Sequence, residues 1–92
     1  MTKFKEVLGR ACWKFFHTMA SADRIPPRNL KKNFSIFMHS LANIYPCEQC
    51  RLHLKELIKT NEPKINSYRD MRQYFIELHN KVNKYLGKPI YN

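Results

Sequence analysis

Two of the three cysteines, Cys47 and Cys50, are three positions apart and follow Pro46 directly, in the stretch YPCEQCRLHL (residues 45–54). Because the proline sets the entry into a helix, we expect the pair in the first helical turn. There the free N–H groups and the helix dipole stabilise a thiolate. A stabilised thiolate makes the corresponding disulfide easier to reduce. The pattern therefore favours a redox-active disulfide that accepts electrons.

Two other uses of this spacing stay open. A structural zinc site needs four ligands, usually as two pairs, and here only Cys47, Cys50 and His53 come together. The third cysteine, Cys12, lies on an apolar stripe without a partner motif. The pair could also be inert buried thiols, which behave as small hydrophobes. We expect no metal site.

A second group of chemically capable residues lies toward the two ends of the chain. Arg10, Trp13 and His17 recur at helical spacing, and so do the polar residues of HNKVNK (residues 79–84). Indole, imidazole and amide groups on one face suit stacking on an aromatic ring and hydrogen bonding to a ribose and phosphates. The alternative is an ordinary solvated helix face, above all for Lys84 and Lys88. Taken together, the residues favour a nucleotide-like cofactor.

The elements that must position these residues are four predicted helices, over residues 3–20, 29–44, 47–60 and 67–86. Prolines and a C-terminal glycine separate or end them, and Ser67 is the expected N-cap of the last. No stretch alternates like a half-buried strand. The sequence predicts an all-α four-helix bundle with one domain, residues 1–92. The expected apolar stripes are Phe4, Leu8, Cys12, Phe15 and Met19; Leu30, Phe34, Phe37, Leu41 and Ile44; Cys50, Leu54, Leu57 and Ile58; and Met71, Phe75, Leu78, Val82 and Leu86.

Composition narrows the function further. The net charge is +10, but the 17 Lys and Arg are spread along the chain, whereas a nucleic-acid-binding domain usually gathers them on one face. We therefore expect no nucleic acid as the main partner; a phosphate-bearing cofactor or an acidic partner would use the charge equally well. No apolar run is long enough to span a membrane. The N-terminus lacks the apolar core of a secretory signal.

Three motifs occur in order: GRACWKFFHT (residues 9–18), YPCEQC (residues 45–50) and LHNKVNKYLGKP (residues 78–89). With them the whole chain resembles the Erv/ALR family of FAD-dependent sulfhydryl oxidases. The resemblance implies a four-helix bundle with FAD bound at one end, commonly dimeric. It also implies disulfide formation with O2 as the final electron acceptor and hydrogen peroxide as product. The alternative is a non-enzymatic basic helical module that binds zinc or nucleic acid.

The resemblance also implies roles for individual residues. Cys50, the inner cysteine, would lie against the isoalloxazine ring, and Cys47, nearer the surface, would exchange with the incoming thiol. The residues that the resemblance assigns to FAD are Gly9, Arg10, Trp13, His17, Tyr45, His79, Asn80, Val82, Asn83, Lys84, Leu86, Gly87 and Lys88.

The sequence departs from many relatives in lacking a second cysteine pair on a flexible tail and a structural disulfide beyond the fourth helix. We therefore expect a separate small thiol carrier protein as the electron donor. These absences look like the single-domain versions of large cytoplasmic DNA viruses, which implies the host cytoplasm or the virion. The alternative compartment is the mitochondrial intermembrane space.

Overall fold

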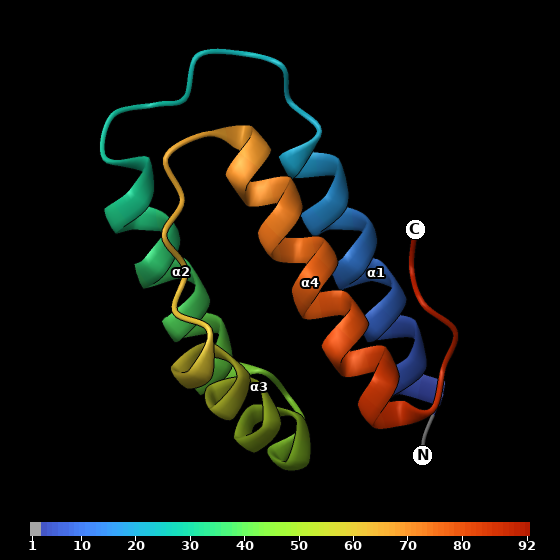
Figure 1. The fold of residues 1–92 in the computed structure, drawn as a ribbon. Helices are drawn as coiled ribbons and strands as arrows, with labels where there is room; N and C mark the ends of the chain where they lie inside the picture. Colours follow the sequence, from blue (N-terminus) through green and yellow to red (C-terminus); the bar gives the residue numbers. More distant parts are fainter. Residues whose placement is uncertain (1–2) are drawn as a thin grey trace. The chain divides into compact units, whose positions relative to one another are not determined.

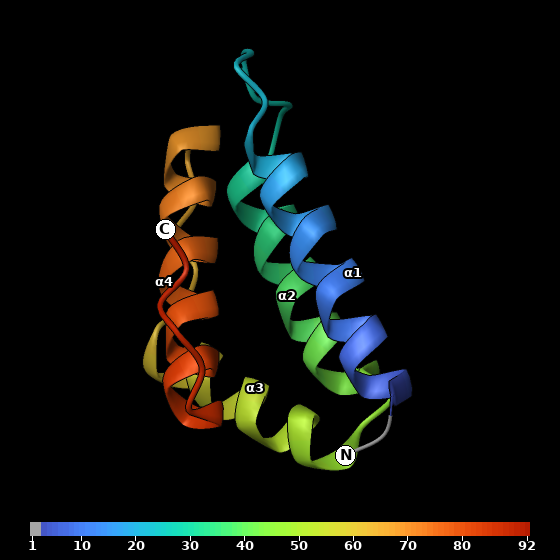
Figure 2. The same cartoon turned by 90° about the vertical axis from the view of Figure 1, so that its right-hand side faces the viewer.

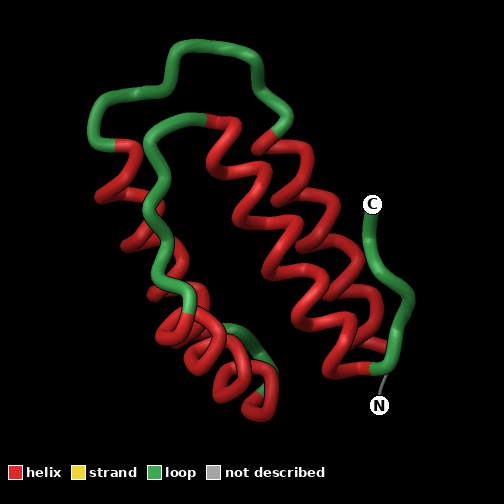
Figure 3. Tube along the Cα trace, in the orientation of Figure 1, coloured by secondary structure: helices red, strands yellow, loops and turns green. Residues whose placement is uncertain are grey.

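A computed structural model describes residues 3–92 of the chain. Four helices account for most of them: α1 (Lys3–Ala20), α2 (Leu30–Ile44), α3 (Glu48–Thr60) and α4 (Tyr68–Leu86). Figure 1 shows the four helices in chain order, and Figure 3 shows only helices and loops over the residues described. The all-α prediction is confirmed, and each helix begins within one residue of its expected start.

The described residues form two compact units. The terminal unit comprises residues 3–24 and 68–92 and contains α1 and α4; the central unit comprises residues 25–67 and contains α2 and α3. In the terminal unit α1 and α4 run side by side in opposite directions (Figures 1 and 2). The rings of Phe16 and Phe75 stack between them, with centroids 4.9 Å apart and planes 4° apart.

The buried face of α1 differs from the expected stripe. Phe4 and Phe15 are 59% and 56% exposed, while Phe16 and Ala20 are buried. Apolar residues cover a wide arc of α1, so two stripes satisfy the 3.6-residue period and spacing alone does not select between them. Contact with α4, through the Phe16–Phe75 stack, decides which stripe is covered.

Specific hydrogen bonds hold the chain where α1 and α4 each end. Arg72 Nη1 donates to the carbonyl oxygens of Ala20 (3.0 Å) and Ala22 (3.3 Å), where α1 has ended. At the other end of the unit, Gly87 has φ 72° and the N–H of Lys88 donates to the Asn83 carbonyl at 2.8 Å. With the Gly87 N–H to Lys84 carbonyl bond of 3.2 Å, this is a Schellman motif. The predicted glycine C-cap is confirmed.

The expected stripe of α4 is right in its first three members and wrong in its last. Met71, Phe75 and Leu78 are buried. Leu86 is exposed; it is the last residue of α4, directly before the C-cap turn at Gly87. Two residues outside the stripe, Tyr74 and Asn83, are buried as well.

In the central unit α2 and α3 pack on each other. The buried side chains of this unit include Phe34, Met38, Ala42, Cys47, Ile58 and, after α3, Ile65. Asn29, just before α2, has a left-handed φ of 58°, a conformation that asparagine tolerates better than most residues. The chain leaves α2 at Tyr45, before Pro46, as predicted. Ile44 was expected in the core but is exposed, because the turn begins at the next residue.

Candidate functional site

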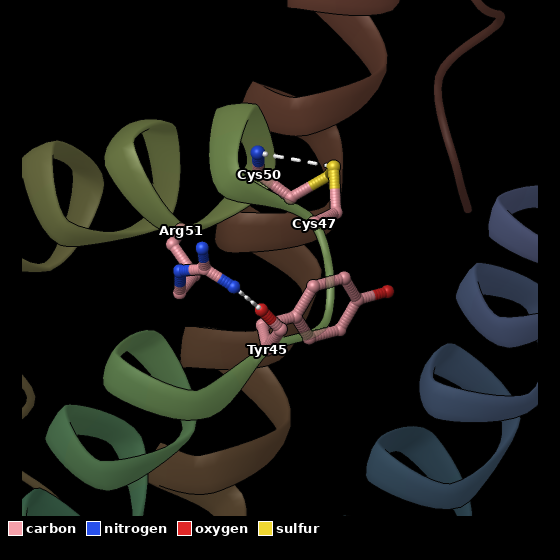
Figure 4. The surroundings of a disulfide bond; sticks show 4 residues. All are labelled: Tyr45, Cys47, Cys50 and Arg51. Carbon is pink, nitrogen blue, oxygen red and sulfur yellow. Dashed lines mark hydrogen bonds between the residues drawn. A yellow bond between two sulfur atoms is a disulfide. The ribbon is translucent and has the colours of Figure 1, made fainter.

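The cysteine pair opens α3, and it is joined as a Cys47–Cys50 disulfide with Cα atoms 5.2 Å apart (Figure 4). Cys47 is the N-cap residue, with the extended backbone typical of that position (φ −165°). The N–H of Cys50 donates to Cys47 Sγ at 3.3 Å. A sulfur therefore takes the place of the usual capping oxygen. The helix N–H groups and dipole are directed at the atom that would carry negative charge after reduction.

The turn before α3 is held by the carbonyl of Tyr45, which accepts two hydrogen bonds. One comes from the N–H of Cys47 at 2.8 Å. The other comes from Arg51 Nη1 at 2.6 Å, and Figure 4 shows the guanidinium reaching back from the first turn of α3. Sequence reasoning missed Arg51. The sequence feature that could have identified Arg51 is a positive charge directly after Cys50. At this helical position the side chain is directed back toward the N-terminus of the helix.

The burial of the two cysteines is the reverse of what the sequence predicted. Cys47 is buried, with 7% of its surface exposed, whereas Cys50 is half-buried. The N-cap conformation explains this order, because it folds the Cys47 sulfur over the first turn of α3. The expectation that Cys47 lies nearer the surface is wrong as a statement about burial.

The terminal unit brings the aromatic candidates from α1 and α4 together. Trp13 stacks on His79, with ring centroids 4.0 Å and planes 8° apart. His17 Nε2 and His79 Nδ1 share a hydrogen bond of 2.9 Å. A fourth ring, Tyr91, stacks on both histidines. We call Trp13, His17, His79 and Tyr91 the ring cluster.

The surroundings of the two histidines of the ring cluster favour their neutral forms. Burial, followed by the nearby His17 and Lys88 as smaller causes, lowers the pKa of His79 to about 4. Burial also lowers the pKa of His17. A hydrogen bond between two imidazole nitrogens needs one of them unprotonated, so the neutral state and the 2.9 Å contact support each other.

Cationic and amide candidates on α4 and directly after it adjoin the ring cluster. Asn80, Lys84 and Lys88, with Lys81 and Ile90, line a surface cavity of about 360 Å³. Asn80 does not point freely into it, because both polar atoms of its side chain bond the backbone of Tyr91. Tyr91 was not among the expected site residues; its only signal was an aromatic residue shortly after the C-cap of α4.

The remaining candidates have simpler surroundings. Gly9 and Val82 are half-buried in the terminal unit, Asn83 is buried, and Arg10, Leu86 and Gly87 are exposed. Tyr45 is half-buried beside the disulfide in the central unit. The candidates thus form two groups: Tyr45, Cys47 and Cys50 in the central unit, and the others in the terminal unit.

Three further observations concern the rest of residues 3–92. His39 Nε2 and Glu62 Oε1 lie 2.6 Å apart at a second surface cavity of about 360 Å³, between α2 and the end of α3. Within the described residues, no three His, Cys, Asp or Glu side chains gather as metal ligands would. None of the described helices combines the length and apolarity that crossing a bilayer requires.

Four helices with a disulfide at the N-terminus of the third define a helical CxxC protein, and solved structures share this fold. The yeast Erv1 core matches with a TM-score of 0.85 and 33% identity, over 95% of this chain and 75% of that one. The FAD binding domain of yeast Erv1 matches with the same score and identity, over 95% and 84%. The sequence pattern of the Erv1 / Alr family matches residues 10–92. The chain belongs to this family.

Similar proteins occur in plants, fungi and viruses. The FAD-linked sulfhydryl oxidase ERV1 of Arabidopsis thaliana is 39% identical over 88 residues, which are 95% of this chain and 46% of the relative. The mitochondrial FAD-linked sulfhydryl oxidase ERV1 of Saccharomyces cerevisiae is 34% identical over 91% of this chain and 45% of its own. The putative FAD-linked sulfhydryl oxidase of Invertebrate iridescent virus 6 is 27% identical over 91% and 83%. The chain thus spans about half the length of the cellular relatives.

Proposed function

We propose that the protein is an FAD-dependent thiol oxidase, which converts pairs of thiols to disulfides and delivers their electrons to O2. The observation that carries the proposal is the Cys47–Cys50 disulfide at the N-terminus of α3, in a member of the Erv1 / Alr family. The relatives named above are called FAD-linked sulfhydryl oxidases.

The terminal unit fits the nucleotide part of FAD. The ring cluster offers flat aromatic surface beside a cavity with three lysines, Lys81, Lys84 and Lys88. Aromatic faces suit an adenine or flavin ring, and ammonium groups suit a pyrophosphate. We assign Gly9, Arg10, Trp13, His17, His79, Val82, Asn83, Lys84, Leu86, Gly87 and Lys88 to this site, with Tyr45 beside the redox pair. When bound, FAD supplies a two-electron acceptor that O2 can reoxidise.

The cysteines carry the thiol chemistry. A substrate thiolate attacks Cys47 Sγ, the Cys47–Cys50 bond breaks, and Cys50 leaves as a thiolate. A second substrate thiolate attacks the substrate sulfur of this mixed disulfide and expels the Cys47 thiolate. Two substrate thiols have then become one disulfide, and the enzyme holds two reduced cysteines, whose two electrons remain to be removed. The bond from the Cys50 N–H stabilises Cys47 as the leaving group.

Arg51 supports the same step through the backbone. Its bond to the Tyr45 carbonyl holds the turn that carries Cys47. Since Cys47 is buried, attack on its sulfur needs a thiol on a chain that can enter the turn, rather than one fixed in a rigid surface.

We further propose that the physiological donor is a small thiol carrier protein with an acidic surface near its cysteines. The net charge of +10 supports this, because complementary charge speeds encounter and makes its rate depend on salt. An interface that must release after each exchange is modest in area.

We also propose a homodimer. Phe4, Val7, Ala11 and Phe15 follow one another at helical spacing on α1, and all four are exposed. An exposed apolar stripe of this length is typical of a surface that a partner covers.

For the compartment, the relatives' names point two ways, because the yeast protein is called mitochondrial and other relatives are viral. We propose the host cytoplasm or the virion, on the strength of the iridescent virus relative, of which the chain covers 83%. The mitochondrial intermembrane space is the alternative, and fractionation of producing cells distinguishes the two.

The proposed function predicts a yellow protein that consumes oxygen. Purified protein should show the visible absorption of oxidised flavin, release free FAD on denaturation, and consume O2 with dithiothreitol as donor while forming hydrogen peroxide. A Cys47→Ser, Cys50→Ser double variant should keep the flavin and lose oxygen consumption. Protein that is colourless and gains no flavin on incubation with FAD would refute the proposal.

A further inference from the structure

A cavity of about 360 Å³ lies within the central unit, between α2 and the end of α3. We call it the α2–α3 cavity. Its lining residues are His39, Ala42 and Asn43 of α2, Lys55 and Lys59 of α3, and Glu62, which follows α3. Of these residues, all except Ala42 carry a polar or charged side chain. Sites for drug-like ligands are lined mainly by apolar groups, so this cavity suits a small, charged ligand instead.

Four of the polar lining residues form two pairs, one on each helix. His39 and Asn43 are four residues apart on α2, and Lys55 and Lys59 are four residues apart on α3. Residues four apart are neighbours on one face of a helix. Both faces border the same cavity, so a ligand bound there would contact α2 and α3 together.

The carboxylate that lines the cavity is paired with the histidine. Glu62 Oε1 lies 2.6 Å from His39 Nε2. Within residues 3–92, neither Lys55 nor Lys59 has an ion pair, and the side chain of Asn43 has no hydrogen-bond partner. All three side chains are exposed to water. Two positive charges and one amide are therefore available to a ligand in the cavity.

We propose that the α2–α3 cavity binds a small phosphate-bearing anion. Lys55 and Lys59 would contact the phosphate oxygens, and the amide of Asn43 would donate a further hydrogen bond. A phosphate group carries about two negative charges at pH 7 and offers three acceptor oxygens, so it matches two ammonium groups better than a carboxylate does. This inference goes beyond the proposed function and does not depend on FAD or on the thiol reaction.

A bound anion would join the two helices that flank the disulfide turn. α2 ends at Ile44 and α3 begins at Glu48, and the segment between them carries Cys47. A ligand that binds only the folded state raises the free energy of unfolding. Phosphate-bearing anions should therefore stabilise the protein against heat.

The test is titration of the purified protein with sodium pyrophosphate, followed by NMR. The side-chain amide protons of Asn43 should shift and reach saturation. Lys55→Met and Lys59→Met should each weaken binding about tenfold, as expected for the loss of one hydrogen bond between charged groups. Glu62→Gln should strengthen binding by up to about fivefold, because it removes a negative charge from the rim of an exposed site.

Two control variants lose the same charge elsewhere. Lys31→Met lies eight residues before His39, about 12 Å away along α2, and should bind pyrophosphate like wild type. Lys84→Met removes a lysine from the cavity of the terminal unit and should leave the Asn43 shift unchanged. Loss of that shift in Lys84→Met, with Lys59→Met like wild type, would refute the inference.

Parallel titrations identify the chemistry of the ligand. Inorganic phosphate and adenosine monophosphate distinguish free phosphate from the phosphate group of a nucleotide, and binding of either supports the site. Sodium acetate is the carboxylate probe. Acetate that shifts the Asn43 amide at the same concentration as phosphate would overturn the choice of phosphate, and no shift with any of the phosphate probes would refute the site itself.

Thermal unfolding gives a second readout. Pyrophosphate should raise the Tm of wild type more than that of a Lys55→Met, Lys59→Met double variant. An equal rise in both proteins would show that the stabilising anion binds elsewhere and would contradict the inference. Oxygen consumption with dithiothreitol tests the oxidase proposal separately, so either proposal can fail without the other.

Discussion

At the scale of single residues, the proposed thiol chemistry rests on the placement of Cys47 as the N-cap of α3. The Cys50 N–H, which any helix end would leave without a helical partner, donates to Cys47 Sγ. The stabilisation of negative charge at this sulfur thus follows from where α3 begins. Arg51, one turn into the helix, adds a positive charge and a second bond to the turn.

The two cysteines should give different spectra when replaced singly. Cys47→Ser leaves Cys50 as the free thiol. If Cys50 is the cysteine that faces the flavin, its thiolate should produce a long-wavelength charge-transfer band. Cys50→Ser should show no such band, and both variants should lose turnover. Cys12→Ala is the control and should keep the wild-type spectrum. If the band appears in Cys50→Ser instead, Cys47 is the cysteine that faces the flavin. The burial of Cys47 taken alone would favour that assignment.

The lowered pKa of His79 predicts a loss of stability in weak acid. Its pKa is about 4 in the folded protein and about 6.5 in the unfolded chain. As the pH falls from 6.5 toward 4, the unfolded chain therefore takes up the proton first, and the free energy of unfolding falls. Because the ring is partly exposed and water screens it, we expect a contribution on the order of 1 kcal/mol between pH 7 and pH 5.

Denaturant unfolding of flavin-free protein at pH 7 and pH 5 measures this loss. His79→Phe keeps an aromatic ring but cannot titrate, so its stability should change less between the two pH values. All other titratable groups are common to both proteins. An equal change in wild type and variant would show that His79 does not contribute.

At the scale of the elements, the end of α4 determines where the C-terminal segment goes. Gly87 adopts φ 72°, which residues with a Cβ rarely do, and the Lys88 N–H bond to Asn83 then reverses the chain. The reversal carries Tyr91 to Asn80. The ring cluster therefore depends on how α4 ends as well as on the packing of α1 and α4.

The two glycines provide a matched test of this role. An added Cβ would meet nothing within 4 Å at either Gly87 or Gly9, so only the backbone conformation distinguishes them. Gly87→Ala should destabilise the flavin-free protein by about 1 kcal/mol, because alanine is strained at positive φ. Gly9→Ala, inside α1, should stabilise it by up to about 1 kcal/mol, since alanine favours the helix. Thermal unfolding measures both, and equal effects would contradict the account of the C-cap.

At the scale of the whole molecule, the exposed stripe on α1 predicts self-association. Phe15→Glu should convert a dimer to a monomer, as measured by sedimentation, because it places a charge in the proposed interface. Phe15 is 56% exposed, so the fold of the single chain should change little. Ile25→Glu, at a residue 93% exposed outside α1, is the control and should leave the dimer intact. A wild-type protein that sediments as a monomer would refute the dimer.

Most of the helix boundaries could be predicted, because their signals are local. Pro46 ends α2 and Gly87 caps α4 through the backbone conformations that these residues impose. The same holds for the position of Cys47 and Cys50 at the start of α3. The family could also be predicted, since its motifs are short stretches with specific residues at specific spacing.

The sequence by itself thus determined the four helices, the redox pair and the family, because these depend on neighbours along the chain. Tertiary structure alone decided which stripe of α1 is buried, since that choice depends on the rings of α4. It also decided that Asn80 binds the backbone of Tyr91, eleven residues away, and that Tyr91 completes the ring cluster. Neither contact has a local signature, because the first depends on the chain reversal at Gly87 and the second also on the packing of α1 on α4.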